Sequence, residues 1–276
     1  MATVLEEIIA GVREDMAQRQ KIVSLDDLKD RVRHQAPALD ALKSLRGSAP
    51  ETLEVIAEVK RSSPSKGALS TIESPADLAA SYEAGGAAVI SVLTEQRRFG
   101  GTLTDLEAVR ERVNIPVLRK DFTVDEYQIW EARAFGADMV LLIVAALDDA
   151  TLARFLALTH ELGMNALVET HTEEEIARAL AVNAQIIGVN VRNLKTLEVD
   201  NANFANLAEH LPADRMIIAE SGVLSTDHVA DYAAHGAQAI LVGEALVRSG
   251  EPTDAVQAFR ATGTAARQTY LDSTTH

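Results

Sequence analysis

The sequence predicts an α/β protein built as a closed (β/α)8 barrel, the TIM-barrel architecture, with a helical extension at its N-terminus. From about residue 54 onward, short apolar runs rich in Val and Ile alternate with stretches of helical periodicity, which is typical of βαβ units and a parallel sheet. Eight runs can be counted, and eight strands each followed by a helix favour a closed barrel. The runs span residues 55–59, 89–93, 117–121, 139–144, 166–169, 186–191, 216–220 and 239–242.

Composition and length agree with this architecture. The chain has 276 residues, of which 47% are hydrophobic but only 4% aromatic, as expected for the aliphatic core of a parallel sheet. Barrels reach such a length as one domain, so we expect a single domain over residues 1–276, with the barrel in 51–276. An open doubly wound sheet is the alternative, but it normally has a G-x-G-x-x-G turn after its first strand, which this chain lacks.

Helical stretches lie between the predicted strands, for example residues 104–113, 125–135, 149–162 and 173–181. Four of the helical stretches in the chain end in a glycine just before the next strand, where a left-handed residue commonly terminates a helix. These glycines are Gly86, Gly136, Gly163 and Gly236. The recurrence of helix, glycine and strand is a weak internal repeat that supports a barrel of similar units.

Residues 1–50 form the predicted N-terminal helical extension. Leu5, Ile8, Ile9, Val12 and Met16 recur at helical spacing, which predicts a first helix with one buried face. A serine at position 24 with an acid three residues later is typical of a helix start, and three leucines after position 37 predict another short helix. We expect this extension to pack on the barrel.

Composition also excludes several classes of function. The chain has no cysteine, and its seven histidines show no H-x-H or H-E-x-x-H spacing, so we expect no metal site. The formal net charge of −15 disfavours nucleic acid as a partner. No apolar leader and no long uncharged apolar run occurs, so we expect a cytoplasmic protein that does not bind a membrane.

Charged residues stand at the carboxyl ends of several runs that should otherwise be apolar. Glu58 and Lys60 share one face of the first strand, and Lys120 shares a face with Leu118 in the third, because alternate residues point to opposite sides. Lys and Glu are almost never fully buried unless they are paired. If these faces line the barrel, the charges meet at the mouth where active sites of this fold lie. The alternative for Glu58 and Lys60 is a structural ion pair that closes the barrel.

Other strand ends suggest the remainder of an acid–base site. Lys120 is the candidate general acid, and Glu169, which ends the fifth run, is the complementary base. Asn190 and Arg192 share a face at the end of the sixth run, where Asn can orient a hydroxyl and Arg can hold an anion. We interpret His171 as part of a helix start with an acidic first turn, and not as a ligand.

Two features predict a phosphate site at the same mouth. The small residues that end the seventh and eighth runs, Ser221-Gly222 and Gly243, allow backbone N–H groups to approach an anion where this fold often binds phosphate. The loop of residues 61–67 is basic and rich in hydroxyls, although an ordinary solvated turn is its alternative interpretation. Glu244 would repel an anion, so we expect its side chain to turn away. We interpret Arg97-Arg98 as a mobile loop tip.

Several of these strand ends also match a known family. The run Ile56-Ala57-Glu58-Val59-Lys60-Arg61-Ser62-Ser63-Pro64-Ser65 resembles the I-A-E-x-K-R-x-S-P-S signature of indole-3-glycerol phosphate synthases. Residues 118–122, 167–169, 188–194 and 219–222 match further strand ends of that family, in order. The resemblance implies an enzyme of tryptophan biosynthesis. Its substrate is 1-(2-carboxyphenylamino)-1-deoxyribulose 5-phosphate, and it closes a ring with loss of CO2 and water, without a metal or an organic cofactor.

The resemblance also implies roles for individual residues. Lys120 would protonate the alkoxide that develops at the ketone, while Glu169, Glu58 and Lys60 are candidates for the acid and base of the dehydration. Lys60 could instead hold the substrate carboxylate, and Asn190 would orient a ribulose hydroxyl. The other implied contacts are to the substrate body, by Ser63, Phe122, Arg192 and Glu220, and to the phosphate, by Arg61, Lys66, Ser221, Gly222 and Gly243.

Position 244 departs from the family pattern. Members often have Ser after the last-strand glycine, where this chain has Glu244, so a side-chain contact to phosphate is not expected there. The phosphorylated substrate is the partner that the resemblance implies, and other enzymes of tryptophan synthesis are further candidate partners.

Two other functions are alternatives. A sugar-phosphate isomerase of histidine or tryptophan synthesis would use an Asp or Cys pair, whereas this chain has no Cys and places Glu and Lys at the strand ends. A catalytically inactive barrel kept as an interaction module would show degraded polar strand ends, yet nearly every end here is intact. Turnover of the carboxyphenylamino substrate discriminates among the three.

Overall fold

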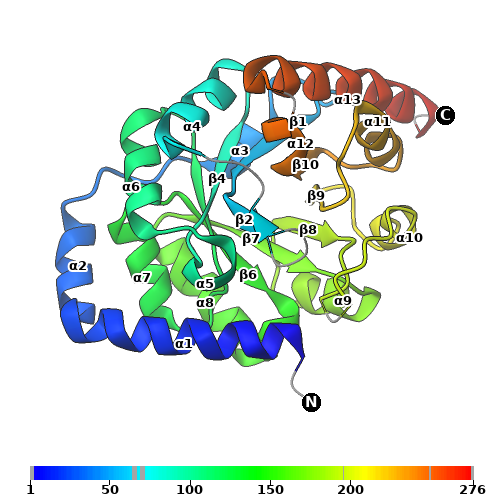
Figure 1. The fold of residues 1–276 in the computed structure, drawn as a ribbon. Helices are drawn as coiled ribbons and strands as arrows, with labels where there is room; N and C mark the ends of the chain where they lie inside the picture. The colour runs from blue at the N-terminus through cyan, green and yellow to red at the C-terminus, as the bar shows by residue number, and fades with distance from the viewer. Residues whose placement is uncertain (1–2, 64–66, 69–71, 195, 249, 275–276) are drawn as a thin grey trace.

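The protein folds as a closed barrel of eight parallel strands surrounded by helices, as the sequence predicts (Figure 1). The structure, a computed structural model, describes residues 3–63, 67–68, 72–194, 196–248 and 250–274. Strands adjacent in the barrel follow one another in the chain, and β1 closes the ring by pairing with both β4 and β10. The barrel strands are β1 Glu54–Val59, β4 Val89–Leu93, β5 Val117–Lys120, β6 Met139–Ile143, β7 Asn165–Thr170, β8 Ile186–Asn190, β9 Met216–Glu220 and β10 Ala239–Val242.

Helices cover the outside of the barrel. The glycines predicted to end helices have left-handed backbones, with φ of 90° at Gly86, 87° at Gly136, 76° at Gly163 and 95° at Gly236. Each predicted strand, and each of the helical stretches predicted between them, matches its element to within one residue at either end. The outer helices are α4 Pro75–Ala84, α6 Leu103–Arg112, α7 Glu126–Ala134, α8 Asp149–Glu161, α9 Glu173–Ala181, α10 Asn203–Ala208, α11 Thr226–Ala234 and α13 Pro252–Thr274.

Short elements that the sequence analysis did not predict lie in the loops between strands and helices. They are the antiparallel pair β2 Ser62–Ser63 and β3 Gly67–Ala68, the helix α5 Gln96–Phe99, the 3-10 turn η1 Val144–Ala146 and the helix α12 Glu244–Arg248. The interpretation of Arg97 and Arg98 as a mobile loop tip is wrong, because both lie in α5 and form ion pairs with acidic residues of the first helix. Opposite charges on the two helices thus face each other across this contact.

Alternation along the strands produces two separate apolar cores, as the parity argument requires. Val55, Ala57 and Val59 of β1 point outward and pack in the layer between strands and helices. Ile56 of the same strand points inward and joins Leu118 and other aliphatic side chains in the barrel interior. Glu58 therefore points into the interior, one layer above these apolar side chains.

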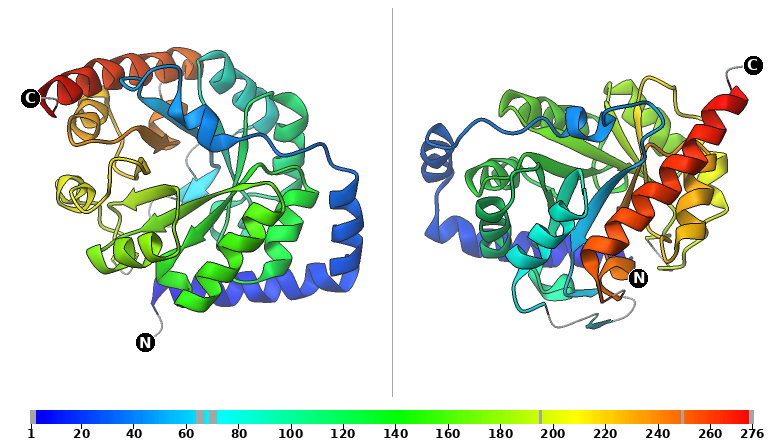
Figure 2. Two further views of the ribbon diagram at one scale, coloured as in Figure 1. Left: turned by 180° about the vertical axis from the view of Figure 1, so that it is seen from behind. Right: turned by 90° about the horizontal axis from the view of Figure 1, so that it is seen from above.

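The N-terminal extension consists of three helices, α1 Val4–Ile22, α2 Leu25–Arg33 and α3 Ala41–Arg46. The predicted start at Ser24 is a capping box with Asp27, in which each side chain accepts from the other residue's backbone N–H. Leu45 of α3 is buried among the interior side chains, so α3 closes one end of the barrel. The view from above places α3 and the β2–β3 pair at opposite ends (Figure 2). Among the helices of the described ranges, none is long and apolar enough to cross a membrane.

A buried ion network connects the extension to the strand that carries Lys120. Arg119 is 2% exposed and donates to Asp121, while its guanidinium also pairs with Glu131 of α7 at 2.9 Å. Arg19 of α1 reaches the same Glu131 at 2.7 Å. A buried charge is stable only with such partners, so α1, α7 and the end of β5 are tied together.

Candidate active site

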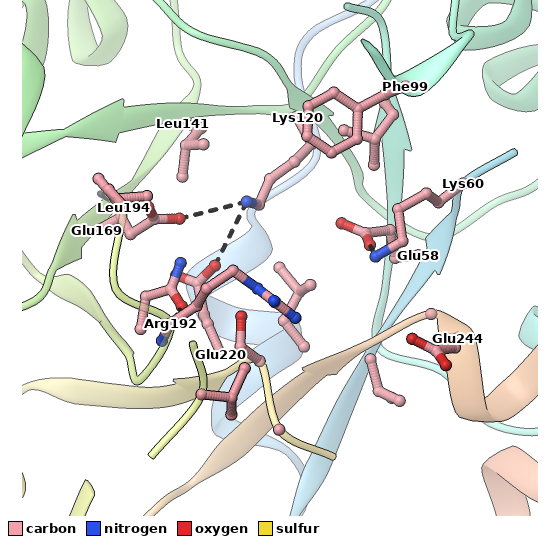
Figure 3. Close-up of a pocket in the computed structure, with 18 of the residues that line it drawn as sticks. Glu58, Lys60, Phe99, Lys120, Leu141, Glu169, Arg192, Leu194, Glu220 and Glu244 are labelled. Atoms are coloured by element: carbon pink, nitrogen blue, oxygen red, sulfur yellow. Dashed lines mark hydrogen bonds and ion pairs between the residues drawn. The ribbon is translucent and has the colours of Figure 1, made fainter. Parts of the chain in front are cut away.

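A pocket of about 610 Å³ opens at the carboxyl ends of the barrel strands (Figure 3). Each of the eight barrel strands contributes at least one residue at or near its carboxyl end to the lining, so the mouth predicted from the strand ends is one cavity. The strand residues are Glu58, Leu93, Lys120, Leu141, Ile143, Glu169, Asn190, Glu220, Leu241 and Val242. Loops and the first turns of α1 complete its rim, with Val4, Leu5 and Ile8 from α1.

Lys120 lies at the floor of the pocket between two carboxylates. Its Nζ is 3.3 Å from Oε2 of Glu169 and 3.6 Å from Oε2 of Glu220 (Figure 3). Burial favours the neutral amine, but the charges of Glu169, Glu220 and Glu58 outweigh it and raise the pKa of Lys120 above its usual value. Lys120 is therefore an ammonium at neutral pH, as a general acid must be.

The two carboxylates around Lys120 differ in their affinity for a proton. Burial raises the pKa of Glu220, and the neighbouring Glu169 carboxylate raises it further, so Glu220 favours its protonated form. Burial also opposes ionisation of Glu169, but the cations of Lys120 and His171 outweigh it and hold the pKa of Glu169 well below its usual range. These opposite shifts favour a single negative charge on the pair, on Glu169, with the proton on Glu220.

Gly188 of β8 makes this pairing of carboxylates sterically feasible. Glu169 is on β7 and Glu220 on β9, and β8 runs between them. A Cβ atom at Gly188 would lie only 1.9 Å from Oε1 of Glu220, so any side chain there would displace the carboxylate. The glycine was visible in the sequence, but nothing in the local pattern distinguished it from a glycine that merely loosens a strand.

Glu58 and Lys60 face each other on the opposite side of the mouth. Lys60 Nζ is 2.6 Å from Oε1 of Glu58, with the Lys60 side chain 20% exposed and that of Glu58 5%. The ion pair that the sequence suggested as an alternative is therefore present. Because both residues also line the pocket, the ion pair is compatible with contacts to a ligand. Both charges are available to a ligand that enters the cavity.

The remaining wall of the pocket is partly polar and partly apolar. Asn190 accepts a hydrogen bond from the backbone N–H of Arg192 at 3.0 Å, and the Arg192 guanidinium donates to the carbonyl of Leu197 at 2.9 Å. On another side, the rings of Phe99 and Phe122 lie with centroids 6.2 Å apart. An aromatic substrate with polar substituents matches a cavity of this mixed character.

The residues predicted to bind phosphate divide into two groups. Ser221, Gly222 and Gly243 all line the pocket, at the adjacent ends of β9 and β10. The Arg61 guanidinium pairs with Asp105 of α6, and Arg61 is not among the described residues that line the pocket. Lys66 lies outside the described residues, and so does the side chain of Ser63, whose backbone forms part of β2.

Glu244 does not turn away from the pocket as expected. Its side chain lines the cavity beside Gly243 and is 14% exposed (Figure 3). It also forms an ion pair with Arg248, one turn later in α12, at 3.0 Å. The i, i+4 spacing on a short helix explains the pairing, since residues four apart are neighbours on a helix surface.

His171 contacts a residue of the pocket, although sequence reasoning treated it only as part of a helix start and it is not among the described residues that line the pocket. The helix start is real, because Thr172 caps α9 and three glutamates occupy its first turn. However, the His171 side chain is only 10% exposed, and its Nε2 lies 3.3 Å from Oε1 of Glu169. The signal was available, since Glu169 and His171 are two residues apart and share a face by the parity rule applied to Glu58 and Lys60.

Comparison with known proteins identifies relatives of this chain. A sequence model of the family "Indole-3-glycerol phosphate synthase" matches residues 5–259. The indole-3-glycerol phosphate synthase of Paenarthrobacter aurescens is 62% identical over 266 residues, which cover 96% of this chain and 98% of that protein. The enzyme of the same name from Mycolicibacterium smegmatis is 57% identical over 263 residues, covering 95% of this chain and 96% of its own length.

Solved structures of lower similarity show the same fold. A 3-hexulose-6-phosphate synthase from Salmonella typhimurium superposes with a TM-score of 0.62 at 15% identity, covering 79% of this chain and 100% of that one. A thiamine phosphate pyrophosphorylase from Pyrococcus furiosus gives a TM-score of 0.58 at 13% identity, covering 78% and 97%. At these identities the likeness shows the shared barrel fold alone.

The raised pKa of Glu220 predicts how the stability of the folded protein changes with pH. In the unfolded chain the Glu220 carboxyl releases its proton above about pH 4.3, whereas in the folded protein it keeps the proton up to about pH 8. Between these two pH values the unfolded state binds fewer protons, so the free energy of unfolding of the wild type falls as the pH rises. Glu220→Gln cannot lose a proton, so the Tm of the variant minus that of the wild type should increase between about pH 5 and about pH 8.

Thermal unfolding across this pH range measures the difference. Glu209→Gln, at an exposed position of the C-cap of α10, controls for the loss of one negative charge from a chain of net charge −15. A Tm difference for Glu220→Gln that stays constant or decreases with pH would show that Glu220 is ionised in the folded protein.

Proposed function

The chain belongs to the indole-3-glycerol phosphate synthase family, and we propose that its ring of charged strand ends performs the ring closure with Lys120 as the principal acid. The chain acts as a carbon–carbon lyase of tryptophan biosynthesis, converting 1-(2-carboxyphenylamino)-1-deoxyribulose 5-phosphate to indole-3-glycerol phosphate with loss of CO2 and water. The observation that carries the residue assignment is the buried ammonium of Lys120, held between Glu169 and Glu220.

The first step joins the ring carbon that bears the carboxylate to the ketone carbon of the ribulose. The ring supplies the electron pair for the new bond, the carbonyl electrons move to oxygen, and that oxygen takes the proton of Lys120. Lys120 suits this role because it is protonated and poorly solvated, so that its charge acts on the developing alkoxide without much screening. Loss of CO2 then restores the aromatic ring.

The last step removes water and forms the indole double bond. The hydroxyl made in the first step leaves as water when an acid protonates it, and a base removes a proton from the carbon next to nitrogen. We assign the base to Glu169, which is the ionised member of the carboxylate pair. Glu220, which holds the proton of the pair, can return one to Lys120 at 3.6 Å and so renew the acid.

Lys60 and Glu58 occupy the other side of the mouth. We assign Lys60 to the substrate carboxylate, because its ammonium is the more exposed of the two pocket lysines and lies away from the Glu169–Glu220 pair. Phe99 and Phe122 would cover the aromatic ring, and Asn190 would orient a ribulose hydroxyl. Other enzymes of tryptophan synthesis are the partner proteins that this function suggests.

The phosphate would lie at the ends of β9 and β10, near the backbone N–H groups of Gly222 and Gly243. Ser221 and Gly222 both have left-handed backbones, with φ of 69° and 72°, which turns the chain sharply at the mouth. Small residues allow an anion to approach the amides closely. The Glu244 carboxylate faces the same cavity, and we infer that it weakens phosphate binding in this chain.

The function is tested by incubating the purified chain with the carboxyphenylamino substrate and recording the fluorescence and absorption spectrum of the indole product. Absence of turnover would favour the inactive-barrel alternative. Turnover of a phosphorylated aminoaldose in place of this substrate would favour an isomerase.

Lys120→Ala should lower kcat by at least about 10²-fold while changing KM little, because the ammonium acts mainly in the transition state. The circular dichroism spectrum should keep its shape. Lys43→Ala, at an exposed position on α3 near the other end of the barrel, is the matched control and should keep full activity. A Lys120→Ala enzyme that keeps half of its kcat would remove Lys120 from the mechanism.

Glu169→Gln keeps the shape and the hydrogen-bonding capacity of the side chain but cannot accept a proton. If Glu169 is the base, kcat should fall by about 10²-fold or more, measured at saturating substrate. If Glu169 is only a structural partner of Lys120, the variant should lose thermal stability and retain kcat, and this outcome would exclude the assignment.

Phosphate binding is tested by two substitutions with opposite expected effects. Gly243→Ala places a Cβ 3.1 Å from Glu58 atoms beside the proposed anion, so KM and the inhibition constant of inorganic phosphate should both rise. Glu244→Ser removes a carboxylate and supplies a hydroxyl, so both constants should fall. Gly222 is unsuitable for such a test, because a Cβ there would lie 2.1 Å from Asn201 and disturb the fold. Unchanged constants in both variants would place the phosphate elsewhere in the mouth.

A further inference from the structure

We propose that His171 is a positioning residue for Glu169: its imidazolium keeps the Glu169 carboxylate ionised and directed toward Lys120, and thereby decides which of the two glutamates acts as the base. The proposal rests on the proposed function of Glu169 and assigns no direct contact between His171 and the substrate. Its basis is the placement of two cations on one carboxylate, Lys120 of β5 and His171 directly after β7, with Glu175 of α9 on the other side of the imidazole ring.

The two oxygens of Glu169 contact different cations. Oε2 is 3.3 Å from Lys120 Nζ, and Oε1 is 3.3 Å from Nε2 of His171. The contact with His171 has the geometry of an ion pair and not that of a linear hydrogen bond, since Nε2 has no hydrogen-bond partner of good geometry among the described residues. The Glu169 side chain is only 2% exposed, so solvent stabilises its negative charge little. Removal of either cation should therefore raise the pKa of Glu169.

Glu175 of α9 holds the other side of the imidazole ring. Its Oε2 is 3.1 Å from Nδ1 of His171 and also accepts the backbone N–H of His171 at 2.8 Å. A histidine between two carboxylates can serve both only when each ring nitrogen carries a proton. Although burial lowers the pKa of His171, its contacts with Glu169 and Glu175 raise that pKa to about 10.

His171 distinguishes Glu169 from Glu220. Lys120 is near both carboxylates and by itself favours the ionisation of either one. His171 forms an ion pair with Glu169, whereas its effect on Glu220 acts over a longer range. The charged groups that act on the imidazole are therefore Glu169 and Glu175 by contact, and Glu220 and Lys120 through the shared cluster. The second cation on Glu169 places the negative charge of the pair there and leaves the proton on Glu220.

The test compares three substitutions. His171→Leu removes the ring, His171→Gln keeps a donor without charge, and His171→Lys keeps the charge. We expect kcat to fall by at least about 10-fold in the first two with KM changed less than about 2-fold, and the acid limb of the kcat–pH profile to move to higher pH, because Glu169 then binds a proton more readily. His171→Lys should recover part of kcat and shift the limb back. His210→Gln is the matched control, since His210 pairs with Glu173 of the same α9 but is 43% exposed.

A second measurement separates positioning from structure. In a Glu169→Gln background, His171→Gln should lower kcat by less than about 2-fold further, because the residue through which it acts is already neutral. NMR of the imidazole nitrogens in the wild type should show both protonated at neutral pH, independently of activity. Full additivity of the two substitutions, an unshifted pH profile, or a neutral ring would each overturn the proposal. A fully active Glu169→Gln enzyme would instead refute the proposed role of Glu169 itself.

Discussion

The positive charge of Lys120, held at a floor that is nearly closed to solvent, requires negative partners, and the mouth of the barrel is organised around that requirement. An unpaired buried ammonium would lose its proton, because burial favours the neutral form. Glu169 and Glu220 prevent this by approaching Nζ from neighbouring parts of the ring. The same two carboxylates repel each other, which raises the pKa of Glu220 and favours its protonated form. One charge requirement thus accounts for both the acid and the base that we propose at this place.

The barrel supplies the geometry that this arrangement needs. Parallel strands bring their carboxyl ends to one rim, so residues separated by a hundred positions in the chain become neighbours. Individual residues of the strands determine which side chains come into contact at the rim. Gly188 of β8 leaves room for the Glu220 carboxylate, which approaches Lys120. Arg119, on the outer face of β5, pairs with Glu131. Because Arg19 of α1 shares that glutamate, the N-terminal extension also restrains the strand end that carries Lys120.

The negative charge of the whole molecule means that an anionic substrate depends on the few cations of the pocket. A net charge of −15 repels a phosphorylated carboxylate, yet the pocket offers Lys60, Lys120 and Arg192 to it. Lys60 and Lys120 are each paired with a carboxylate of the pocket, Glu58 and Glu169, so an anionic substrate competes with these carboxylates for the two lysines. Glu244 adds a further negative charge at the rim where the phosphate is proposed to bind.

The sequence by itself determined the architecture and most of the ring of charged residues. Short apolar runs, helices ended by Gly86 or Gly136, and the parity that puts Glu58 and Lys60 on one face are consequences of local chain geometry, which the order of residues specifies. The pairing of side chains was decided only by the tertiary structure. That His171 reaches Glu169, that Arg61 pairs with Asp105 and that Glu244 faces the pocket depend on distances between separate elements. Those distances are set by how strands close and helices pack, and a one-dimensional pattern of polarity contains no measure of them.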